Sequence, residues 1–334
     1  MTILVTGSAG FIGAALTEAL LNAGVTVVGI DSMTPYYDVE LKRARLARVI
    51  DHPCYVHITQ DLAEREAVAR LFQTQAPTLV VHLAAQPGVR YSLEHPETYV
   101  DSNVVAFGNI LEGCRHTRVR HLIFASSSSV YGGNERLPFS TSDGVDHPVS
   151  LYAATKRANE LMAHTYAHLY DLPTTGLRFF TVYGPWGRPD MAPYRFTQRI
   201  LSGEPIDVYN HGDHRRDFTY IDDIVDGIRA VIDGPAPGRM DAPMPDDPGT
   251  SSAPYRLYNI GQGKPVDLEH FIGCLERAIG RPATRRELPM QPGDIRYTWA
   301  DITPLTRALG YRPKVDVATG TARFVTWFRD YHNL

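Results

Sequence analysis

A glycine-rich turn between an apolar strand and a helix is the feature that most constrains the fold of this chain. The chain opens with the apolar run Ile3–Val5 and then reads Gly-Ser-Ala-Gly-Phe-Ile-Gly over residues 7–13. In this G-x-x-G-x-x-G pattern, Gly7 permits a tight turn, Gly10 lets a pyrophosphate approach backbone amides, and Gly13 lets the helix pack close to the strand. The helix N-terminus then faces the negative phosphates. Strand, glycines and helix in this order predict a dinucleotide-binding turn.

Apolar strands alternate with helical segments through the first half of the chain. We expect strands near residues 3–5, 25–30, 54–58, 78–83, 121–127 and 172–179, and helices near residues 11–23, 41–49, 63–73, 96–115 and from 151 onward. Fully apolar strands that alternate with helices indicate a parallel sheet covered on both faces. The predicted fold class is therefore α/β, a Rossmann-type doubly wound parallel sheet.

The alternation breaks after about Tyr183, where short segments rich in Gly, Pro, Arg and Asp follow. We expect helices near residues 194–201, 221–232 and 268–279, and a solvent loop at the proline-rich stretch 234–254. We predict a dinucleotide-binding domain at residues 1–182, to which later segments return. Residues 183–334 are predicted to form mainly a smaller α/β substrate-binding lobe.

Composition narrows the class of partner and the compartment. The net charge of -4 over 334 residues gives no general attraction to nucleic acid or to an anionic membrane, so an anionic ligand must be held by local arginines. Three scattered cysteines indicate reduced thiols, and the histidines show no spacing typical of a metal site. Neither a signal peptide nor a long apolar run is found, so we expect a cytoplasmic protein.

Acidic and small residues at the ends of later strands indicate which dinucleotide binds. Asp31 closes the second strand about twenty residues after the turn, where a carboxylate accepts hydrogen bonds from ribose hydroxyls and repels a 2′-phosphate. Asp61 follows the third strand and either faces the adenine or caps the next helix. The run 82–86 leaves the fourth strand with small residues, as a backbone passing close to a cofactor requires. These positions favour NAD over NADP.

A tyrosine and a lysine form the candidate catalytic pair. Tyr152 and Lys156 lie four residues apart near the start of a predicted helix, so they share one face. Oxidation of a carbinol carbon needs removal of its hydroxyl proton, and a tyrosine with a pKa of about 10 is seldom ionised at neutral pH. A nearby ammonium lowers such a pKa by about one to three units. We predict Tyr152 as the base, Lys156 as its tuner and a ribose ligand, and Ser127 as a partner of the same substrate oxygen.

Motifs along nearly the whole chain carry a family resemblance. They are TGSAGFIG, GIDSMTPYYD, HLAAQPGVRYS, SSSSVYG, YAATK, RFFTVYGPWGRPDM, DVYNHGDHRRDFTYIDD, YNIG and MQPGD. With them the chain resembles the extended short-chain dehydrogenase/reductases, and within these the UDP-glucuronate 4-epimerases. The resemblance implies a UDP-sugar substrate, a tightly held NAD and a homodimer built on the two long helices.

The resemblance also implies roles for individual residues. It makes Ser127, Tyr152 and Lys156 catalytic. The expected cofactor-binding residues are Gly7, Gly10, Phe11, Ile12, Gly13, Asp31, Asp61, Leu62, Leu83, Ala84, Ala85, Asn103, Tyr152, Lys156 and Phe179. The expected substrate-binding residues are Pro87, Arg90, Ser127, Ser128, Ser129, Tyr152, Thr181, Arg188, Arg216 and Asp294. Arg216 matches the arginine that holds the UDP phosphates, and Asp294 the carboxylate that holds its ribose.

Three hydroxyls distinguish this chain from its relatives. Sugar-nucleotide dehydratases and UDP-glucuronate decarboxylases carry acidic residues where this chain has Ser128 and Ser129, and UDP-galactose 4-epimerases carry asparagine where it has Thr181. Hydroxyls suit a C6 carboxylate, which Asp or Glu would repel. Oxidation at C4 creates a β-keto acid prone to lose carbon dioxide. Our hypothesis is that the hydroxyls hold the carboxylate in an orientation unfavourable for that loss.

The leading function from the sequence is 4-epimerisation of UDP-glucuronate to UDP-galacturonate through a transient 4-keto sugar, which makes the protein an isomerase. The alternatives are a UDP-glucuronate decarboxylase and a neutral UDP-glucose/galactose 4-epimerase. A non-catalytic NAD-binding regulator is a more remote alternative, because the chain retains Ser127, Tyr152 and Lys156.

Overall fold

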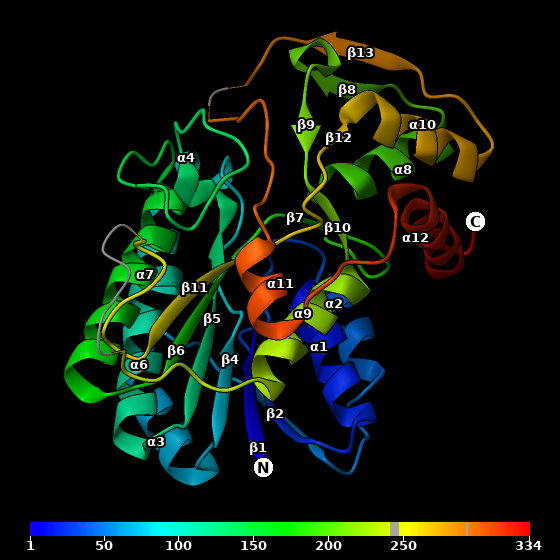
Figure 1. Ribbon diagram of the computed structural model, residues 1–334. Helices are drawn as coiled ribbons and strands as arrows, with labels where there is room; N and C mark the ends of the chain where they lie inside the picture. The colour runs from blue at the N-terminus through cyan, green and yellow to red at the C-terminus, as the bar shows by residue number, and fades with distance from the viewer. Residues whose placement is uncertain (241–246, 292) are drawn as a thin grey trace.

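A seven-stranded sheet forms the centre of the molecule (Figure 1). The computed structural model describes residues 1–240, 247–291 and 293–334. The sheet order is β11-β6-β5-β4-β1-β2-β3, and every neighbouring pair is parallel. Its strands are β1 (Thr2–Thr6), β2 (Thr26–Asp31), β3 (Tyr55–Thr59), β4 (Leu79–His82), β5 (His121–Ser127), β6 (Thr174–Phe179) and β11 (Tyr255–Ile260). The predicted doubly wound α/β class is confirmed.

Helices cover both faces of this sheet. One face carries α3 (Arg65–Gln75), α6 (Ala106–Thr117) and α7 (Leu151–Tyr170); the other carries α1 (Phe11–Asn22), α2 (Val39–Ala47), α9 (Ile221–Asp233) and α11 (Thr303–Leu309). Within β1, Ile3 and Val5 join the apolar core on the α1 side, whereas Leu4 joins the core on the α6 side. This alternation is the side-chain period of a strand buried on both faces.

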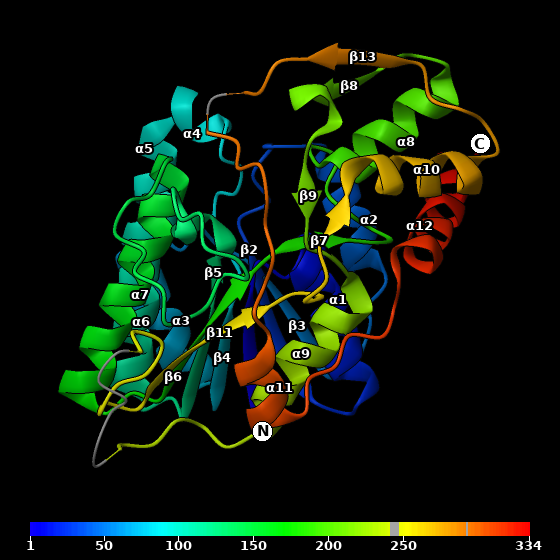
Figure 2. The same ribbon diagram turned by 45° about the horizontal axis from the view of Figure 1, so that its top comes forward.

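A smaller lobe lies above the carboxyl ends of the strands (Figure 2). It contains α8 (Ala192–Ser202), α10 (Leu268–Ile279) and α12 (Val317–His332), and the short strands β7 (Thr181–Tyr183), β8 (Ile206–Tyr209), β9 (Arg215–Arg216), β10 (Phe218–Tyr220), β12 (Val266–Asp267) and β13 (Arg285–Leu288). These strands pair as β10–β7, β12–β9 and β13–β8. Strand β11 leaves this lobe and joins the main sheet beside β6.

The structure adds elements that were not expected after residue 183, among them α11 and α12, and it differs from the expectation at two places in the main sheet and its helices. The helix expected at residues 96–115 is instead α5 (Pro96–Tyr99), a π-helical turn η1 (Val100–Val105) and α6, preceded by the short α4 (Tyr91–Glu94). π-helical turns frequently occur at functional sites, and here the Asn103 side chain in η1 forms hydrogen bonds with the backbone of Gln86. Strand β11 was not expected, because its run Tyr-Arg-Leu-Tyr-Asn-Ile mixes polar and apolar residues.

Two further expectations concern the proline-rich loop and membrane segments. The described parts of residues 234–254 form turns and irregular backbone, and residues 241–246 of that loop lie outside the described residues. Among the described residues, no helix combines the length and apolar character that crossing a membrane requires.

Candidate active site

Two adjoining cavities lie at the carboxyl ends of the parallel strands, where sheets of this class bind ligands. The first, of about 270 Å³, extends over the glycine-rich turn and the ends of β2 and β4. The second, of about 590 Å³, lies between the sheet and the smaller lobe. Both are lined by Ser127, Tyr152, Phe179 and Arg188, so the cavities meet at the candidate catalytic residues.

The structure brings nearly all of the predicted site residues to these cavities. The first is lined by Gly7, Gly10, Phe11, Ile12, Gly13, Asp31, Asp61, Leu62, Leu83, Ala84, Ala85, Tyr152, Lys156 and Phe179. The second is lined by Pro87, Arg90, Ser127, Ser128, Ser129, Tyr152, Thr181, Arg188, Arg216 and Asp294. Their individual roles stay predictions, because position alone does not identify a contact.

Asn103 is the predicted cofactor residue that lies behind the first cavity rather than in its lining. It is buried, its Oδ1 accepts from the Gln86 amide at 2.7 Å, and its Nδ2 donates to Gln86 O and Thr155 Oγ1 at 3.1 Å each. Its side chain therefore fixes the loop after β4. A direct cofactor contact from Asn103 would require exchange of one of these bonds.

The glycine-rich turn has the geometry that a dinucleotide pyrophosphate needs. Gly7 adopts φ +71°, a left-handed conformation that favours glycine, and a Cβ there would meet Ala84 N at 2.9 Å. A Cβ on Gly13 would lie 2.0 Å from Gly7 O, so only glycine lets α1 begin this close to β1. The residues present therefore fit a dinucleotide, with the first amides of α1 open to the cavity.

Asp31 and Asp61 both combine a cavity position with a backbone bond. The Asp31 carboxylate accepts from Ala9 N at 3.2 Å and from Met33 N at 2.8 Å, and the Lys42 ammonium lies 3.4 Å from it. The Asp61 carboxylate accepts from Ala63 N at 2.9 Å. Asp61 thus forms a local turn ahead of α3 and also lines the first cavity. Its two predicted roles, at the start of the helix and beside the adenine, are therefore compatible.

Tyr152 and Lys156 lie on one face of α7, as their spacing predicts. Ser150 caps the helix by accepting from Ala153 N at 3.1 Å. Burial raises the pKa of Tyr152, while Ser127 and Arg188 act in the opposite direction. Burial lowers the pKa of Lys156 to about 8, and its ammonium donates to Ala125 O at 2.9 Å.

The charged group that lowers the pKa of Tyr152 among the described residues is Arg188. The expected role of Lys156 as the cation beside Tyr152 stays a prediction, and its ammonium donates to the backbone of β5. Arg188 is itself held by Asp190, whose carboxylate also accepts from Tyr36 Oη at 3.1 Å.

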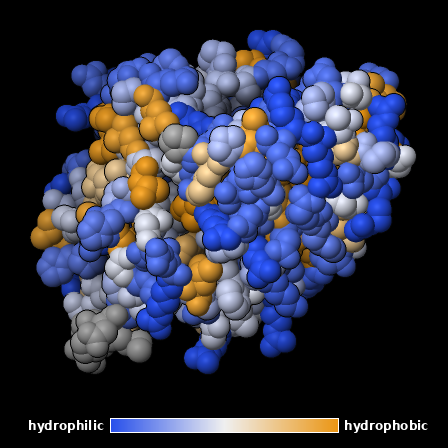
Figure 3. All heavy atoms as spheres, turned by 90° about the horizontal axis from the view of Figure 1, so that it is seen from above, coloured by the Kyte–Doolittle hydropathy of each residue, from blue (hydrophilic) through white to orange (hydrophobic). Residues whose placement is uncertain are grey.

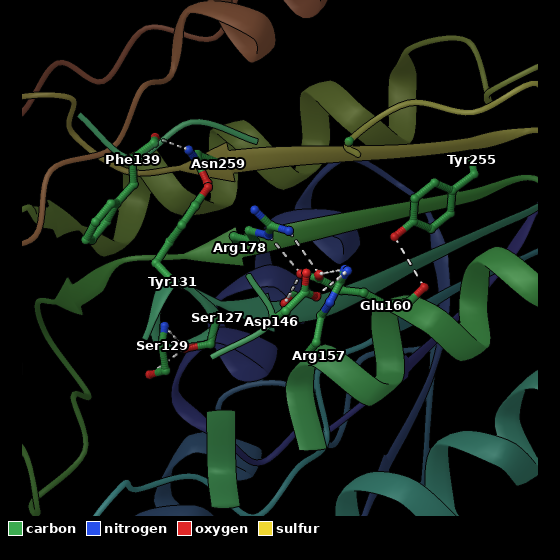
Figure 4. Close-up of polar contacts among 12 residues, drawn as sticks. Ser127, Ser129, Tyr131, Phe139, Asp146, Arg157, Glu160, Arg178, Tyr255 and Asn259 are labelled. Atoms are coloured by element: carbon green, nitrogen blue, oxygen red, sulfur yellow. Dashed lines mark hydrogen bonds and ion pairs between the residues drawn. The ribbon is translucent and has the colours of Figure 1, made fainter. Parts of the chain in front are cut away.

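Behind the catalytic residues lies a buried ionic cluster centred on Glu160 (Figure 4). Glu160 is on α7, four residues after Lys156, and is fully buried. Its carboxylate accepts from Ser126 Oγ at 2.6 Å, from Arg178 Nε and Nη2 at 2.8 and 3.0 Å, and from Arg157 Nη1 at 3.1 Å. Because Ser126 precedes Ser127 in β5, this cluster ties the catalytic helix to the serine-bearing strand.

The cluster continues to the edge strand β11 of the main sheet (Figure 4). The Arg178 guanidinium lies 4.9 Å from the centre of the Tyr131 ring, and Tyr131 Oη donates to Asn259 Oδ1 at 2.7 Å. Asn259, in β11, donates to Phe139 O at 2.7 Å. Strands β5, β6 and β11 are thus joined to the helix that carries Tyr152.

Hydroxyl groups line the part of the second cavity nearest the catalytic residues. Ser127 Oγ donates to Ser129 Oγ at 3.1 Å and accepts from Ser129 N at 3.2 Å. Ser128 and Thr181 line the same cavity. This grouping offers donors to an anionic or hydroxylated end of a ligand.

The far end of the second cavity carries the predicted nucleotide-binding residues. Arg90 Nη2 lies 3.1 Å from Asp294 Oδ2, so these two pair with each other. Arg216 Nη1 donates to Arg296 O at 2.9 Å, and burial lowers the pKa of Arg216 to about 10, which leaves it charged at neutral pH. A charged arginine bound to neutral carbonyl oxygens is suited to an incoming phosphate.

Sequence reasoning missed several residues that shape the site. Asp217 follows Arg216, is buried, and accepts from the amides of Gln262, Gly263 and Ala300 at 2.6, 3.0 and 3.0 Å. It fixes the loops around the second cavity. Glu160 could have been found from its helical spacing to Lys156, whereas the three backbone partners of Asp217 come from distant segments that no local pattern connects.

Comparisons with known proteins agree with this geometry. Residues 3–244 match the model of the NAD dependent epimerase/dehydratase family. The chain is 50% identical to Protein CapI of Staphylococcus aureus, with 99% of each chain covered. It is 48% identical to a probable UDP-glucuronate 4-epimerase of Rhizobium meliloti (strain 1021), over 98% of this chain and 97% of that protein.

A solved structure gives the same result for the fold. The UDP-glucuronic acid 4-epimerase of Bacillus cereus, in complex with UDP-glucuronic acid and NAD, has a TM-score of 0.88 and 33% identity, over 99% of this chain and 100% of that chain. The glycine turn, the candidate catalytic residues Ser127, Tyr152 and Lys156, and the two adjoining cavities are thus found in a chain that belongs to the NAD dependent epimerase/dehydratase family.

Proposed function

We propose that this protein is an NAD-dependent UDP-sugar 4-epimerase that interconverts UDP-glucuronate and UDP-galacturonate. The observation that carries the proposal is the position of Ser127 and Tyr152 where the cavity over the glycine-rich turn meets the larger second cavity. The likeness to the Rhizobium meliloti and Bacillus cereus proteins supports the choice of substrate.

Each catalytic residue has a distinct task in this proposal. NAD, when bound, supplies a reversible acceptor for the hydrogen at the sugar's C4. Tyr152 takes the C4 hydroxyl proton as the carbon is oxidised and returns it when the 4-keto sugar is reduced from the other face. Ser127 hydrogen-bonds the same oxygen. Lys156 binds the cofactor ribose and adds positive charge near the phenol.

Inversion requires the 4-keto sugar to turn over while the nucleotide stays bound. Arg216 and Arg90 are the proposed phosphate ligands, and Asp294 the proposed ribose ligand. Both arginines line the second cavity at its far end. An anchored nucleotide with looser sugar contacts allows the sugar to rotate.

The hydroxyl cluster favours a uronate over the alternatives. Ser128, Ser129 and Thr181 line the second cavity, and we assign the C6 carboxylate to these hydroxyls. Neither Ser128 nor Ser129 supplies the acidic group expected of a decarboxylase. A neutral-sugar epimerase is expected to carry asparagine at the position where this chain has Thr181.

The test is product analysis after incubation of purified protein and NAD with UDP-glucuronate. We expect UDP-galacturonate, in an equilibrium reached from either sugar. A UDP-pentose with release of carbon dioxide would establish the decarboxylase instead. Turnover of UDP-glucose but not UDP-glucuronate would establish the neutral-sugar epimerase, and absence of turnover with both would favour the regulator.

We also propose that the protein is a cytoplasmic homodimer built on α6 and α7. Leu161 and Leu169, eight residues apart on α7, are 55% and 59% exposed, and Val105 beside α6 is 38% exposed. Apolar groups are also visible on the side of α4 and α7 in Figure 3. Light scattering is expected to give twice the chain mass for the native protein, and the chain mass for Leu161→Asp with Leu169→Asp.

A further inference from the structure

A buried arginine joins the two cavities without lining either. Arg45 lies on α2 and is 1% exposed. Its Nη1 donates to Ala9 O at 3.0 Å and to Tyr37 Oη at 2.6 Å. Its Nε and Nη2 donate to Trp186 O at 3.1 and 2.7 Å, and Nη2 also donates to Gly187 O at 3.3 Å. All the nitrogens of the guanidinium are therefore bound to oxygen.

The carbonyl acceptors, Ala9, Trp186 and Gly187, belong to the two segments that the site needs to hold in register. Ala9 lies within the glycine-rich turn, directly before the Gly10 N-cap of α1. Trp186 and Gly187 directly precede Arg188, which lines both cavities and acts on the pKa of Tyr152. One side chain thus bridges the dinucleotide turn and the loop that carries a substrate-side cation.

The loop is held in an uncommon conformation at the point where Arg45 binds it. Trp186 adopts φ +64°, a left-handed conformation that is unfavourable for a bulky residue. Its ring packs against Trp327 of α12 and beneath the Arg48 guanidinium, with centroid distances of 5.3 and 5.0 Å. The two bonds from Arg45 to Trp186 O and the ring contacts together favour this conformation.

The charge of Arg45 has no carboxylate in contact among the described residues. Its acceptors are carbonyl oxygens and a phenol, while the nearby Asp31 is bound by Lys42. A buried cation without a bound anion is costly unless it is hydrogen-bonded. An anionic pyrophosphate at the adjacent turn would supply the missing negative charge.

We propose that Arg45 is a positioning residue that locks the Gly7–Gly13 turn to the Trp186–Gly187 segment, so that a ligand in either cavity strengthens binding in the other. Because each cavity has one wall fixed through Arg45, ordering of one wall also orders the second. The inference rests on the proposed function only for the identity of the two ligands, NAD and a UDP-sugar.

The test measures linkage between the two ligands without turnover. NAD is titrated calorimetrically into cofactor-stripped full-length protein, with and without saturating UDP. The variants are Arg45→Met, which keeps the apolar stem, and Arg48→Met as the matched control at the C-cap of α2. Arg48 also contacts the Trp186 ring but pairs with the partly exposed Glu18.

For the wild type and Arg48→Met we expect UDP to tighten NAD binding by about fivefold or more. For Arg45→Met we expect weaker binding of each ligand alone by at least tenfold, and a linkage factor near one. An unchanged linkage factor in Arg45→Met, or no linkage in the wild type, would overturn the proposal.

A second variant keeps the test decisive if Arg45→Met folds poorly. Arg45→Lys retains the charge but cannot donate to both segments at once, so we expect it to restore part of the NAD affinity and none of the linkage. Restored linkage in Arg45→Lys would show that the charge alone is sufficient, and it would contradict the proposal that hydrogen bonds to both segments are needed. Since UDP and NAD binding need no reaction, failure here is distinct from failure to convert UDP-glucuronate.

Discussion

The two ends of the second cavity are built in different ways. At the catalytic end, the Glu160–Arg178 ion pair is fully buried and ties the helix of Tyr152 to two strands. At the nucleotide end, Arg90 pairs with Asp294, and their side chains are 45% and 21% exposed. Exposed pairs contribute about 0–1 kcal/mol, so they can exchange partners when a ligand arrives. The catalytic end is fixed in advance, whereas the nucleotide end is free to re-pair around its ligand.

The largest effect is expected when the phenol oxygen of Tyr152 is removed from the catalytic end of the second cavity. Tyr152→Phe keeps the ring but removes the proposed base, so we expect kcat to fall by about 10²–10⁴-fold with unchanged binding of NAD and UDP. Tyr170→Phe, at the exposed end of the same helix, is the matched control. Wild-type turnover by Tyr152→Phe would refute its role.

Glu160→Gln tests whether the buried cluster is what fixes that end. Removal of its charge leaves the buried Arg178 uncompensated, while Arg157 still pairs with Asp146. We therefore expect a loss of about 3 kcal/mol in the free energy of unfolding and a lower kcat. Denaturant unfolding and kcat per folded site measure the two effects. Glu112→Gln on α6, whose pair with Arg115 is exposed, should change stability by less than about 1 kcal/mol. Equal losses of stability in Glu160→Gln and Glu112→Gln would contradict the claim that the buried cluster fixes the catalytic end.

Arg216→Met tests the nucleotide end. Loss of a charged hydrogen bond to phosphate is worth about 1.5–3 kcal/mol, so we expect UDP affinity to fall by about 10- to 100-fold. The value of kcat at saturating substrate should change little, because the catalytic end is independent of this residue. A large fall in kcat with unchanged UDP affinity would show that Arg216 acts in catalysis and would contradict its assignment as a nucleotide ligand.

Lys156→Met tests whether the fixed end is built for function at the expense of stability. The pKa of Lys156 is about 8 in the folded protein and about 10.4 in the unfolded chain, so the unfolded state binds its proton more tightly. The resulting destabilisation is full below pH 8 and disappears as the pH rises toward 10.4. We expect Lys156→Met to be inactive, yet about 1–2 kcal/mol more stable at pH 6.5, with the gain reduced because Ala125 O loses its donor.

Thermal unfolding of the cofactor-free protein across pH 6.5–10 checks this prediction. Lys314→Met, whose pair with Asp226 is exposed, serves as the control and should show no such gain. A Lys156→Met variant that is less stable at pH 6.5 would contradict the sign of the pKa shift.

Thr181→Ala has the smallest expected effect and concerns the fidelity of the fixed end. Loss of one hydroxyl from the proposed carboxylate site should leave epimerisation within about tenfold of wild type, because a neutral hydrogen bond is worth about 0.5–1.5 kcal/mol. We expect a larger share of pentose product and released carbon dioxide. If that share stays the same as in wild type, Thr181 does not orient the carboxylate.

The part of the site nearest the sheet was predictable from the sequence. The glycines, Asp31 and the Tyr152–Lys156 pair lie at fixed local spacings, and local spacing determines which side chains share a turn or a helix face. Family motifs then supplied residues such as Arg216 and Asp294, which line the expected cavity.

The remaining features depend on contacts between distant segments. Strand β11 lies at the edge of the sheet beside β6, although its sequence includes the strongly polar Arg256 and Asn259. The bonds of Arg45 to Trp186 span 141 residues, and those of Asp217 to the Ala300 amide span 83. The electrostatics of Tyr152 likewise depend on where the Lys156 ammonium points. No local pattern encodes such distances.

The most direct measurement is a crystal structure of the protein with NAD and UDP-glucuronate. We predict that Tyr152 Oη and Ser127 Oγ lie within about 2.6–3.2 Å of the sugar's C4 hydroxyl, with the nicotinamide ring facing C4 and the uridine at Asp294. A sugar whose C4 lies beyond reach of Tyr152, with the phenol turned away from the nicotinamide, would contradict it.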